Sequence, residues 1–467
     1  MKIQTQTRMS LSRAALAWLA LTVMLKVVID LTGVQTLGVA LDDHWQFLDL
    51  PELLANPIHS LMSLHSQPPL LNLVVFVLAK LPGDLYGNFV WLNAACAGLT
   101  TVLLMRIGAG LGLGVFVCCL LGVAYIFSPA VILNTAYPFY PNLTALGYAA
   151  MAFAFLCACQ GHAAGLVLFG VSAVYLGWLR SSFSIAHLLA LMSVLYLVSS
   201  APVKRGAWLT LLCVSIACSL IVPVKNKLMY GFFGASSWGS LNIANGLDIQ
   251  GPLGAFPWPS VIREEMPALK CAHSYGFQDE SDFKRNGEPN YNSCLMLAYG
   301  AVLKEQVLEQ YTFKQHARQM AIHFLRYIAL PDKYMFLQSR GKIKAYADRY
   351  DQMWLPISWS GRGAFSGHDE RLAVLVVLSG ALCAFWRYRN PLLGALLAML
   401  LLHAAAHILT DGKEAQRFVY DVEFLLYLFY GWGLQHVIRC CLPLARRLVR
   451  REGFEQLDRG SAAPPGQ

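Results

Sequence analysis

Charged side chains are scarce in this sequence. Asp, Glu, Lys and Arg make up 13% of the 467 residues, whereas hydrophobic residues make up 56%. A soluble domain carries about 25% charged residues, so this composition excludes an ordinary soluble globular protein. The net charge is +9, but the basic residues gather beside apolar runs, which is how membrane proteins fix their orientation. We therefore expect membrane lipids, and no nucleic acid, among the partners.

Cysteines in polar surroundings are also few. Of the 12 cysteines, only Cys271 and Cys294 lie in a long polar region. The others lie in or beside apolar runs, where cysteine packs as a small hydrophobic residue. If the polar region faces an oxidising compartment, Cys271 and Cys294 form a disulfide; two free thiols are the alternative.

Apolar runs recur along the chain, most of them about 17 to 22 residues long, which is enough to cross the hydrocarbon core of a bilayer. They predict an all-α, polytopic membrane protein. The first run also fits a cleaved signal peptide, but Lys26 and Asp30 within it favour a retained span. The predicted helices cover residues 14–31, 69–81, 86–105, 111–128, 143–159, 164–180, 184–199, 207–223, 371–388, 391–410 and 419–440.

Basic residues at both ends of the chain predict cytoplasmic termini, which requires an even number of spans. The run 69–81 is too short to cross and is bounded by Pro-Pro and Leu-Pro-Gly, so we expect a helix in the membrane plane. About ten spans then remain. The polar regions on the non-cytoplasmic face are 35–85, 129–142, 224–369 and 411–418.

Four parts follow from this topology. They are an N-terminal transmembrane module with the outer loop 35–85 (1–223), a large, mostly helical non-cytoplasmic region (224–369), the C-terminal transmembrane helices (370–445) and a basic, disordered cytoplasmic tail (446–467).

The first outer loop has a high density of polar residues. Asp42 and Asp43 directly follow the first span, and the segment HSQPP, which begins at His65, closes the loop. A carboxylate at the membrane surface can act as a general base or bind a divalent cation. The prolines fix the backbone, so His65 and Gln67 can hydrogen-bond a phosphate or a sugar. A solvated acidic loop and a rigid helix corner are the simpler interpretations.

Other outer positions have two interpretations each. Tyr140 and Asn142 follow further aromatic residues, which form either an interfacial belt or a sugar-stacking surface. Arg180 lies at the outer end of a span, where it either meets an anionic headgroup or phosphate or snorkels. Asn290 and Asn292, in KRNGEPNYNS, form a substrate-contacting or a structural turn. The basic helix predicted from residue 295 to 330 lies on the bilayer or on a small domain.

The entry to the last span contains Glu414, Arg417, Asp421 and Glu423. Arg417 and Asp421 are four residues apart, so they share a helix face and either pair with each other or form a functional site. A guanidinium suits bidentate contact with a phosphate.

Taken together, three motifs resemble the GT-C superfamily of membrane glycosyltransferases, which use polyprenyl-phosphate sugars and include protein O-mannosyltransferases and lipid A aminoarabinose transferases. The first is the acidic pair after span one. HSQPPLLN is similar to the family's Pro-Pro-Leu segment, and GKEAQRFVYDVEFLL to its Glu-x-x-Arg-Phe region. The resemblance covers residues 14–223 and 371–440.

This resemblance implies a GT-C-like helical bundle with in-plane helices in the first outer loop. It also implies an inverting glycosyltransferase in a bacterial inner membrane, with its active site on the periplasmic or extracellular face. The donor would be a polyprenyl-phosphate sugar and the acceptor a glycan, lipid or protein. Asp42 or Asp43 would be the catalytic acid, His65 and Gln67 would line the site, and Arg417 would hold the lipid phosphate.

One departure concerns metal ions. Many relatives carry a second acid in the next outer loop, whereas 129–142 has none and contains Asn134 and Asn142. This disfavours a bridging Mg²⁺ or Mn²⁺. His403 and His407 are one helical turn apart and form either a metal pair or, as we favour, a packing pair. The alternative functions are a transporter or flippase of lipid-linked saccharides and a glycan polymerase or ligase.

Overall fold

The computed structural model describes about two thirds of the chain in defined segments. Of these residues 79% are helical and none belongs to a sheet; Phe283 and Pro289 form an isolated bridge. The all-α prediction is therefore confirmed for this part of the chain. The described residues are 11–34, 46–183, 185–198, 205–247, 249, 251–253, 257–267, 283–287, 289–327, 379–380, 382, 390–410 and 419–435.

Most predicted apolar runs coincide with one helix each. The helices are α1 (Leu11–Thr32), α2 (Leu50–Ala55), α3 (Pro57–Ser63), α4 (Leu70–Ala79), α5 (Leu85–Gly110), α6 (Val115–Ile126), α7 (Pro129–Ala136), α8 (Pro141–Cys159), α9 (Ala163–Leu179), α10 (Ile185–Val198), α11 (Arg205–Tyr230), α12 (Gly239–Leu247), α13 (Pro259–Glu265), α14 (Cys294–Gln310), α15 (Phe313–Tyr327), α18 (Pro391–Thr410) and the 3₁₀ helix η3 (Val419–Val422). Residues 423–435 continue η3 as an α-helix.

In the described part of the chain, four helices, α1, α5, α8 and α11, are long and apolar enough to cross a membrane, and the bent pair α6–α7 is a fifth if it counts as one span. The number is smaller than the ten or so predicted. α9 and the apolar part of α18 are shorter, and most of the predicted span 371–388 and the end of 419–440 lie outside the described residues. α1 exposes several large aliphatic side chains, among them Leu16, Leu19 and Leu31. A helix that is apolar on its exposed face suits a lipid environment, so the membrane character of the chain is supported.

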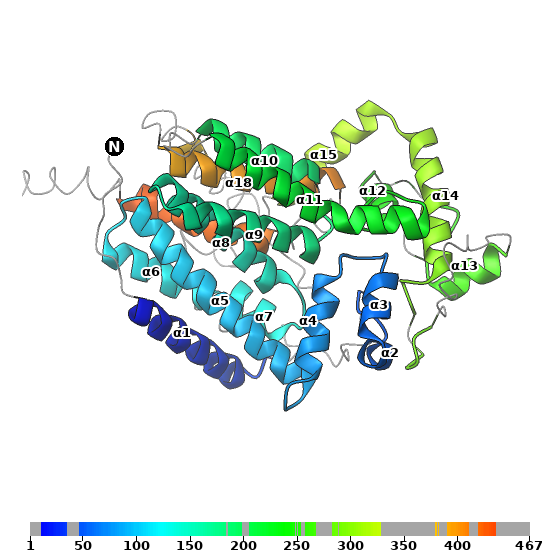
Figure 1. The fold of residues 1–467 in the computed structure, drawn as a ribbon, viewed down its shortest axis with the longest axis horizontal. Helices are drawn as coiled ribbons and strands as arrows, with labels where there is room; N and C mark the ends of the chain where they lie inside the picture. Colours follow the sequence, from blue (N-terminus) through cyan, green and yellow to red (C-terminus); the bar gives the residue numbers. More distant parts are fainter. Residues whose placement is uncertain are drawn as a thin grey trace, which may run out of the picture.

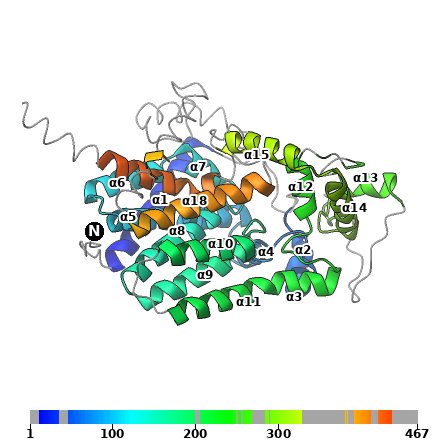
Figure 2. The ribbon, with the colours of Figure 1, turned by 90° about the horizontal axis from the view of Figure 1, so that it is seen from above.

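The helical bundle is built around α8. This helix packs against α5, α9, α18 and η3, and it is buried along most of its length. Small residues allow the close crossing with α9: a Cβ on Gly165 would lie 2.5 Å from the backbone nitrogen of Ala158. Figure 2 shows α18 beside α10 and α8, so the late part of the chain closes the bundle.

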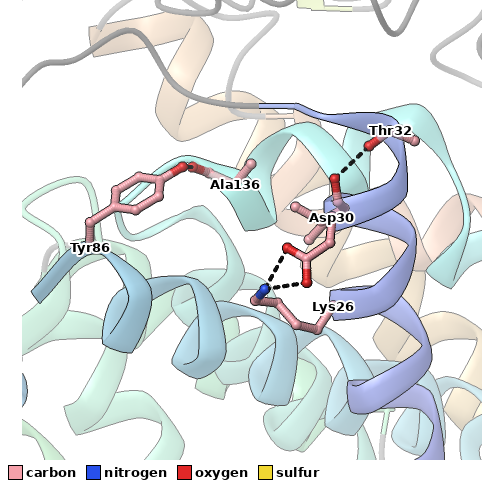
Figure 3. Close-up of polar contacts among 6 residues, drawn as sticks. Lys26, Asp30, Thr32, Tyr86 and Ala136 are labelled. Carbon is pink, nitrogen blue, oxygen red and sulfur yellow. Dashed lines mark hydrogen bonds and ion pairs between the residues drawn. The ribbon is translucent and has the colours of Figure 1, made fainter. Parts of the chain in front are cut away.

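Polar residues at the C-terminal end of α1 neutralise each other. The Lys26 ammonium lies 2.5 and 2.6 Å from the two carboxylate oxygens of Asp30, one turn later (Figure 3). Nearby, the Tyr86 hydroxyl donates to the carbonyl oxygen of Ala136 at 2.9 Å and ties the start of α5 to the end of α7. The charged residues inside the first apolar run are thus compatible with a membrane helix.

The prediction that residues 129–142 form an outer loop is wrong. Residues 129–136 form α7, which is completely buried, and α8 begins at Pro141. The start of α7 has a local cause: the Ser128 hydroxyl accepts a hydrogen bond from the Val131 amide at 3.1 Å, and Pro129 occupies the first turn, where its missing N–H costs nothing. The pair α6–α7 is bent by 48°.

α11 is longer than predicted, because it continues through Pro223 to Tyr230. The run 69–81, in contrast, contains α4, whose 10 residues span about 15 Å, half of the hydrocarbon core. The helix is short, as expected, and its orientation in the membrane plane stays a prediction. In Figure 1, α4 lies beside the bundle, and α2 and α3 lie between α4 and α13.

The described part of the large loop is helical, as expected. α12, α13 and α14 enclose a small core of their own that includes Trp238, Ile262 and Tyr299. The helix predicted over 295–330 is divided into two, α14 and α15, and residues 328–330 lie outside the described residues. Cys294, at the start of α14, is disulfide-bonded, which favours the disulfide over the free thiol; Cys271 lies outside the described residues.

Candidate functional site

The corner at the end of α3 is held by an asparagine from far along the chain. The backbone N–H groups of His65 and Ser66 both donate to Asn292 Oδ1, at 2.8 and 3.0 Å. Asn292 Nδ2 donates to the carbonyl oxygen of Ser63 at 3.2 Å. His65, Ser66 and Asn292 are all buried. A single amide side chain therefore fixes the backbone just before the two prolines.

The imidazole of His65 is neutral. Its Nδ1 lies 2.9 Å from Ser237 Oγ, and its ring meets that of Tyr230 edge-on, with centroids 5.0 Å apart. Burial, and then the positive charge of Lys225, lower the pKa of His65 from 6.5 to about 3. Lys225 itself donates to the carbonyl oxygen of Leu64. His65 therefore supplies no positive charge at the corner.

These contacts define the corner group: His65, Ser66, Lys225, Ser237 and Asn292. Asn290 supports this group, since its Oδ1 accepts a hydrogen bond from the backbone N–H of Asn292 at 3.0 Å. Sequence reasoning missed Lys225, Tyr230 and Ser237. The signal that could have found the first two is the helical periodicity that continues past Pro223.

A second polar group lies inside the bundle. Arg180 Nη1 donates to Asp421 Oδ2 in a buried ion pair, with side-chain exposures of 6% and 2%. The guanidinium also lies over the ring of Tyr140, 5.1 Å from its centroid. His403 Nε2 lies 3.5 Å from the same Asp421 oxygen. Because its charge is balanced by Asp421, Arg180 is not an isolated cation at the membrane surface.

Asn142 joins this group from the first turn of α8. The Tyr420 hydroxyl donates to Asn142 Oδ1, and Asn142 Nδ2 donates to Thr135 Oγ1 at 3.3 Å. Four elements meet here, namely the end of α9, the start of α8, η3 and α18. We call Tyr140, Asn142, Arg180, His403, Tyr420 and Asp421 the ion-pair group.

One apolar cluster connects the two groups. It contains Leu64, which precedes His65, Leu179, which precedes Arg180, and Tyr140 itself. Its members also include Phe47 and Phe139, whose rings meet edge-on at 6.2 Å. The corner group and the ion-pair group therefore border the same packed cluster.

The predicted site residues thus form two sets. His65, Asn290 and Asn292 meet at the corner. Tyr140, Asn142 and Arg180 belong to the ion-pair group, where Arg180 contacts Asp421 and the Tyr140 ring and Asn142 contacts Tyr420. Gln67 is half-buried beside the corner. Asp42, Asp43, Glu414 and Arg417 lie outside the described residues, so their roles stay predictions.

Among the described residues, one group has the composition of a metal site. His403, His407 and Asp421 place one ligand atom each within 4.8 Å of one another.

No protein-family model matches the chain, and no curated protein sequence is significantly similar to it.

Proposed function

We propose that this chain is a membrane glycosyltransferase that transfers a sugar from a polyprenyl-phosphate donor to a lipid, glycan or protein acceptor at the non-cytoplasmic face. The observation that supports it most is the meeting of distant polar residues around one apolar cluster. The first outer loop, the large loop and the entry to the last helix all contribute. A bundle of about ten spans in a bacterial inner membrane, with cytoplasmic termini, belongs to the same proposal.

Connectivity links the predicted catalytic groups to this cluster. Asp43 precedes Phe47 by four residues, and Arg417 precedes Tyr420 by three. Phe47 packs against Phe139, and Tyr420 bonds to Asn142. Phe47 and Tyr420, which closely follow Asp43 and Arg417 in the sequence, therefore contact residues that are only three positions apart, Phe139 and Asn142.

In the proposed reaction, Asp43, or else Asp42, accepts the proton of the acceptor hydroxyl. The hydroxyl oxygen attacks the anomeric carbon of the sugar while the bond to the lipid phosphate breaks, which inverts the configuration. Arg417 stabilises the negative charge that develops on the departing phosphate. The neutral His65 contributes hydrogen bonds rather than charge.

Arg180 has a positioning role in this scheme. Its ion pair with Asp421 fixes η3, and η3 begins two residues after Arg417. A buried ion pair with additional contacts holds a segment in a single geometry. Arg180 therefore positions the phosphate-binding arginine and does not bind the phosphate by itself.

The test uses purified full-length protein in liposomes with a panel of labelled polyprenyl-phosphate hexoses and pentoses. Release of polyprenyl phosphate is the readout, because this product is common to all sugars and acceptors. We expect Asp43→Asn or Asp42→Asn to reduce the release by about 10²- to 10⁴-fold.

Glu52→Gln is the matched control. Glu52 is an acid of the same outer loop and forms an exposed ion pair with Arg285, so its replacement should leave the release unchanged. Wild-type rates in both aspartate variants would exclude the proposed general base.

A transporter of lipid-linked saccharides is the second candidate. The observation that favours it is the ion-pair group, because ionisable residues buried among apolar helices often line translocation pathways. A flipping assay with a fluorescent polyprenyl-phosphate sugar distinguishes the two. Translocation without release of polyprenyl phosphate favours the transporter, whereas release favours the transferase. A polymerase or ligase would transfer a whole glycan chain and would not need Asp42 or Asp43.

A further inference from the structure

His403 and His407 extend from one face of α18. They are one helical turn apart, and their ring centroids are 4.5 Å apart. Asp421, on η3, faces them from another element, and its Oδ2 lies 3.5 Å from His403 Nε2. All three side chains are buried, with at most 2% of each residue exposed.

Two imidazoles and one carboxylate are a common ligand set for Zn²⁺. In a tetrahedral site with bonds of about 2.0–2.1 Å, neighbouring ligand atoms are about 3.4 Å apart. The distance between His403 Nε2 and Asp421 Oδ2, 3.5 Å, already has this value. The ligand atoms of all three residues lie within 4.8 Å of one another, so small side-chain rotations bring them to the ion.

The i,i+4 spacing of the histidines supports this arrangement. On a helix it directs both rings to the same side, as in zinc sites built on a single helix. A carboxylate from a second element then completes the set. An ion at this position would tie α18 to η3.

Arg180 fits as the outer partner of the carboxylate. Carboxylates that bind metal ions are themselves usually hydrogen-bonded, and this contact orients them. Arg180 donates such a bond to Asp421. The charges of Arg180, Asp421 and a divalent ion sum to about +2, so the open fourth position would favour an anionic ligand.

We propose that His403, His407 and Asp421 bind one divalent transition-metal ion, Zn²⁺ by the chemistry of the ligands. The site joins the last two described helical segments of the bundle. It is independent of the glycosyltransferase proposal, since its test measures metal content.

His187 provides a matched control. It is a buried histidine of α10 whose ring lies 6.5 Å from that of Tyr148, and Tyr148 contacts His403. It does not belong to the group of three ligands. His187→Gln therefore removes an imidazole from the same region without removing a proposed ligand.

The experiment measures metals by elemental analysis in full-length protein purified through a peptide tag that contains no histidine. We expect about one equivalent of Zn²⁺ in the wild type and in His187→Gln. His407→Gln should bind it at least about 10-fold more weakly. A second measurement, on wild-type protein stripped with a chelator, adds Co²⁺ and records the absorption bands typical of tetrahedral coordination.

The outcomes are distinct. Metal retention in His187→Gln but not in His407→Gln supports the site. Equal metal content in the wild type and His407→Gln overturns it. If His407→Gln does not fold, the wild-type Co²⁺ spectrum decides: tetrahedral bands support the site, and their absence, with no Zn²⁺ in the purified protein, overturns it.

Discussion

Removing the arginine of the buried ion pair should destabilise the bundle severely. Arg180 and Asp421 have side-chain exposures of only 6% and 2%, so water does not screen their interaction. In Arg180→Met the carboxylate of Asp421 loses its guanidinium and stays buried. Breaking a buried pair in this way costs about 3–5 kcal/mol. The lost contact with the buried Tyr140 ring adds about 2 kcal/mol.

Two comparisons isolate the effect of burial. The double variant Arg180→Met with Asp421→Asn removes both charges, so we expect it to recover most of the lost stability. Arg285→Met removes a comparable ion pair at the surface, where Arg285 contacts Glu52 and is 61% exposed. That change should cost about 1 kcal/mol or less.

The assay is unfolding of the reconstituted protein in mixed micelles, followed by tryptophan fluorescence at several detergent fractions. The reasoning would be refuted if Arg180→Met were no less stable than Arg285→Met. Failure of the double variant to recover stability would show that geometry rather than unbalanced charge causes the loss. Excess Zn²⁺ should reduce the cost of Arg180→Met if the proposed ion binds Asp421.

Two further predictions concern the corner group. Asn292→Ala leaves the buried N–H groups of His65 and Ser66 without their acceptor. We expect the free energy of unfolding to fall by about 2–4 kcal/mol. Thermal unfolding measures this loss, and Asn286→Ala, in the same polar segment, is the comparison. Stability should also fall at low pH because of His65, whose folded pKa is about 3 rather than 6.5. Its contribution is complete above pH 6.5 and is lost as the pH falls towards 3, by up to about 1.4 kcal/mol per unit. His65→Gln should flatten this dependence, and an unchanged pH profile would contradict the assignment.

Much of the helical framework could be predicted from the sequence. Runs such as 143–159 and 164–180 correspond to α8 and α9 within a few residues, because uninterrupted apolar stretches leave the helix as the favoured local structure in lipid. The errors have local causes as well. The Ser-Pro start of α7 lies in a segment for which the sequence predicts a loop, and α11 continues past Pro223, where the apolar run ends.

The pairing of the polar residues could not be predicted in the same way. Asp421 has an arginine four residues earlier in the sequence, so Arg417 is the ion-pair partner that the local pattern offers. The structure pairs it with Arg180, 241 positions away. His65 and Asn292 are separated by 227 positions. Such contacts depend on how the helices pack, and the sequence pattern of each segment contains no information about its partner.

The charge balance of the two polar groups limits where a phosphate can bind. In the ion-pair group Arg180 is neutralised by Asp421, and at the corner His65 is neutral. An anion in a low-dielectric site needs a positive charge that is not already compensated.

The bundle side therefore needs either Arg417 or a metal ion on His403, His407 and Asp421, whereas Lys225 supplies a cation at the corner. Arg417→Met, removal of the metal and Lys225→Met each withdraw one of these charges. If the proposed polyprenyl-phosphate donor binds, the change that weakens its binding with protein folding intact identifies the charge that holds the phosphate.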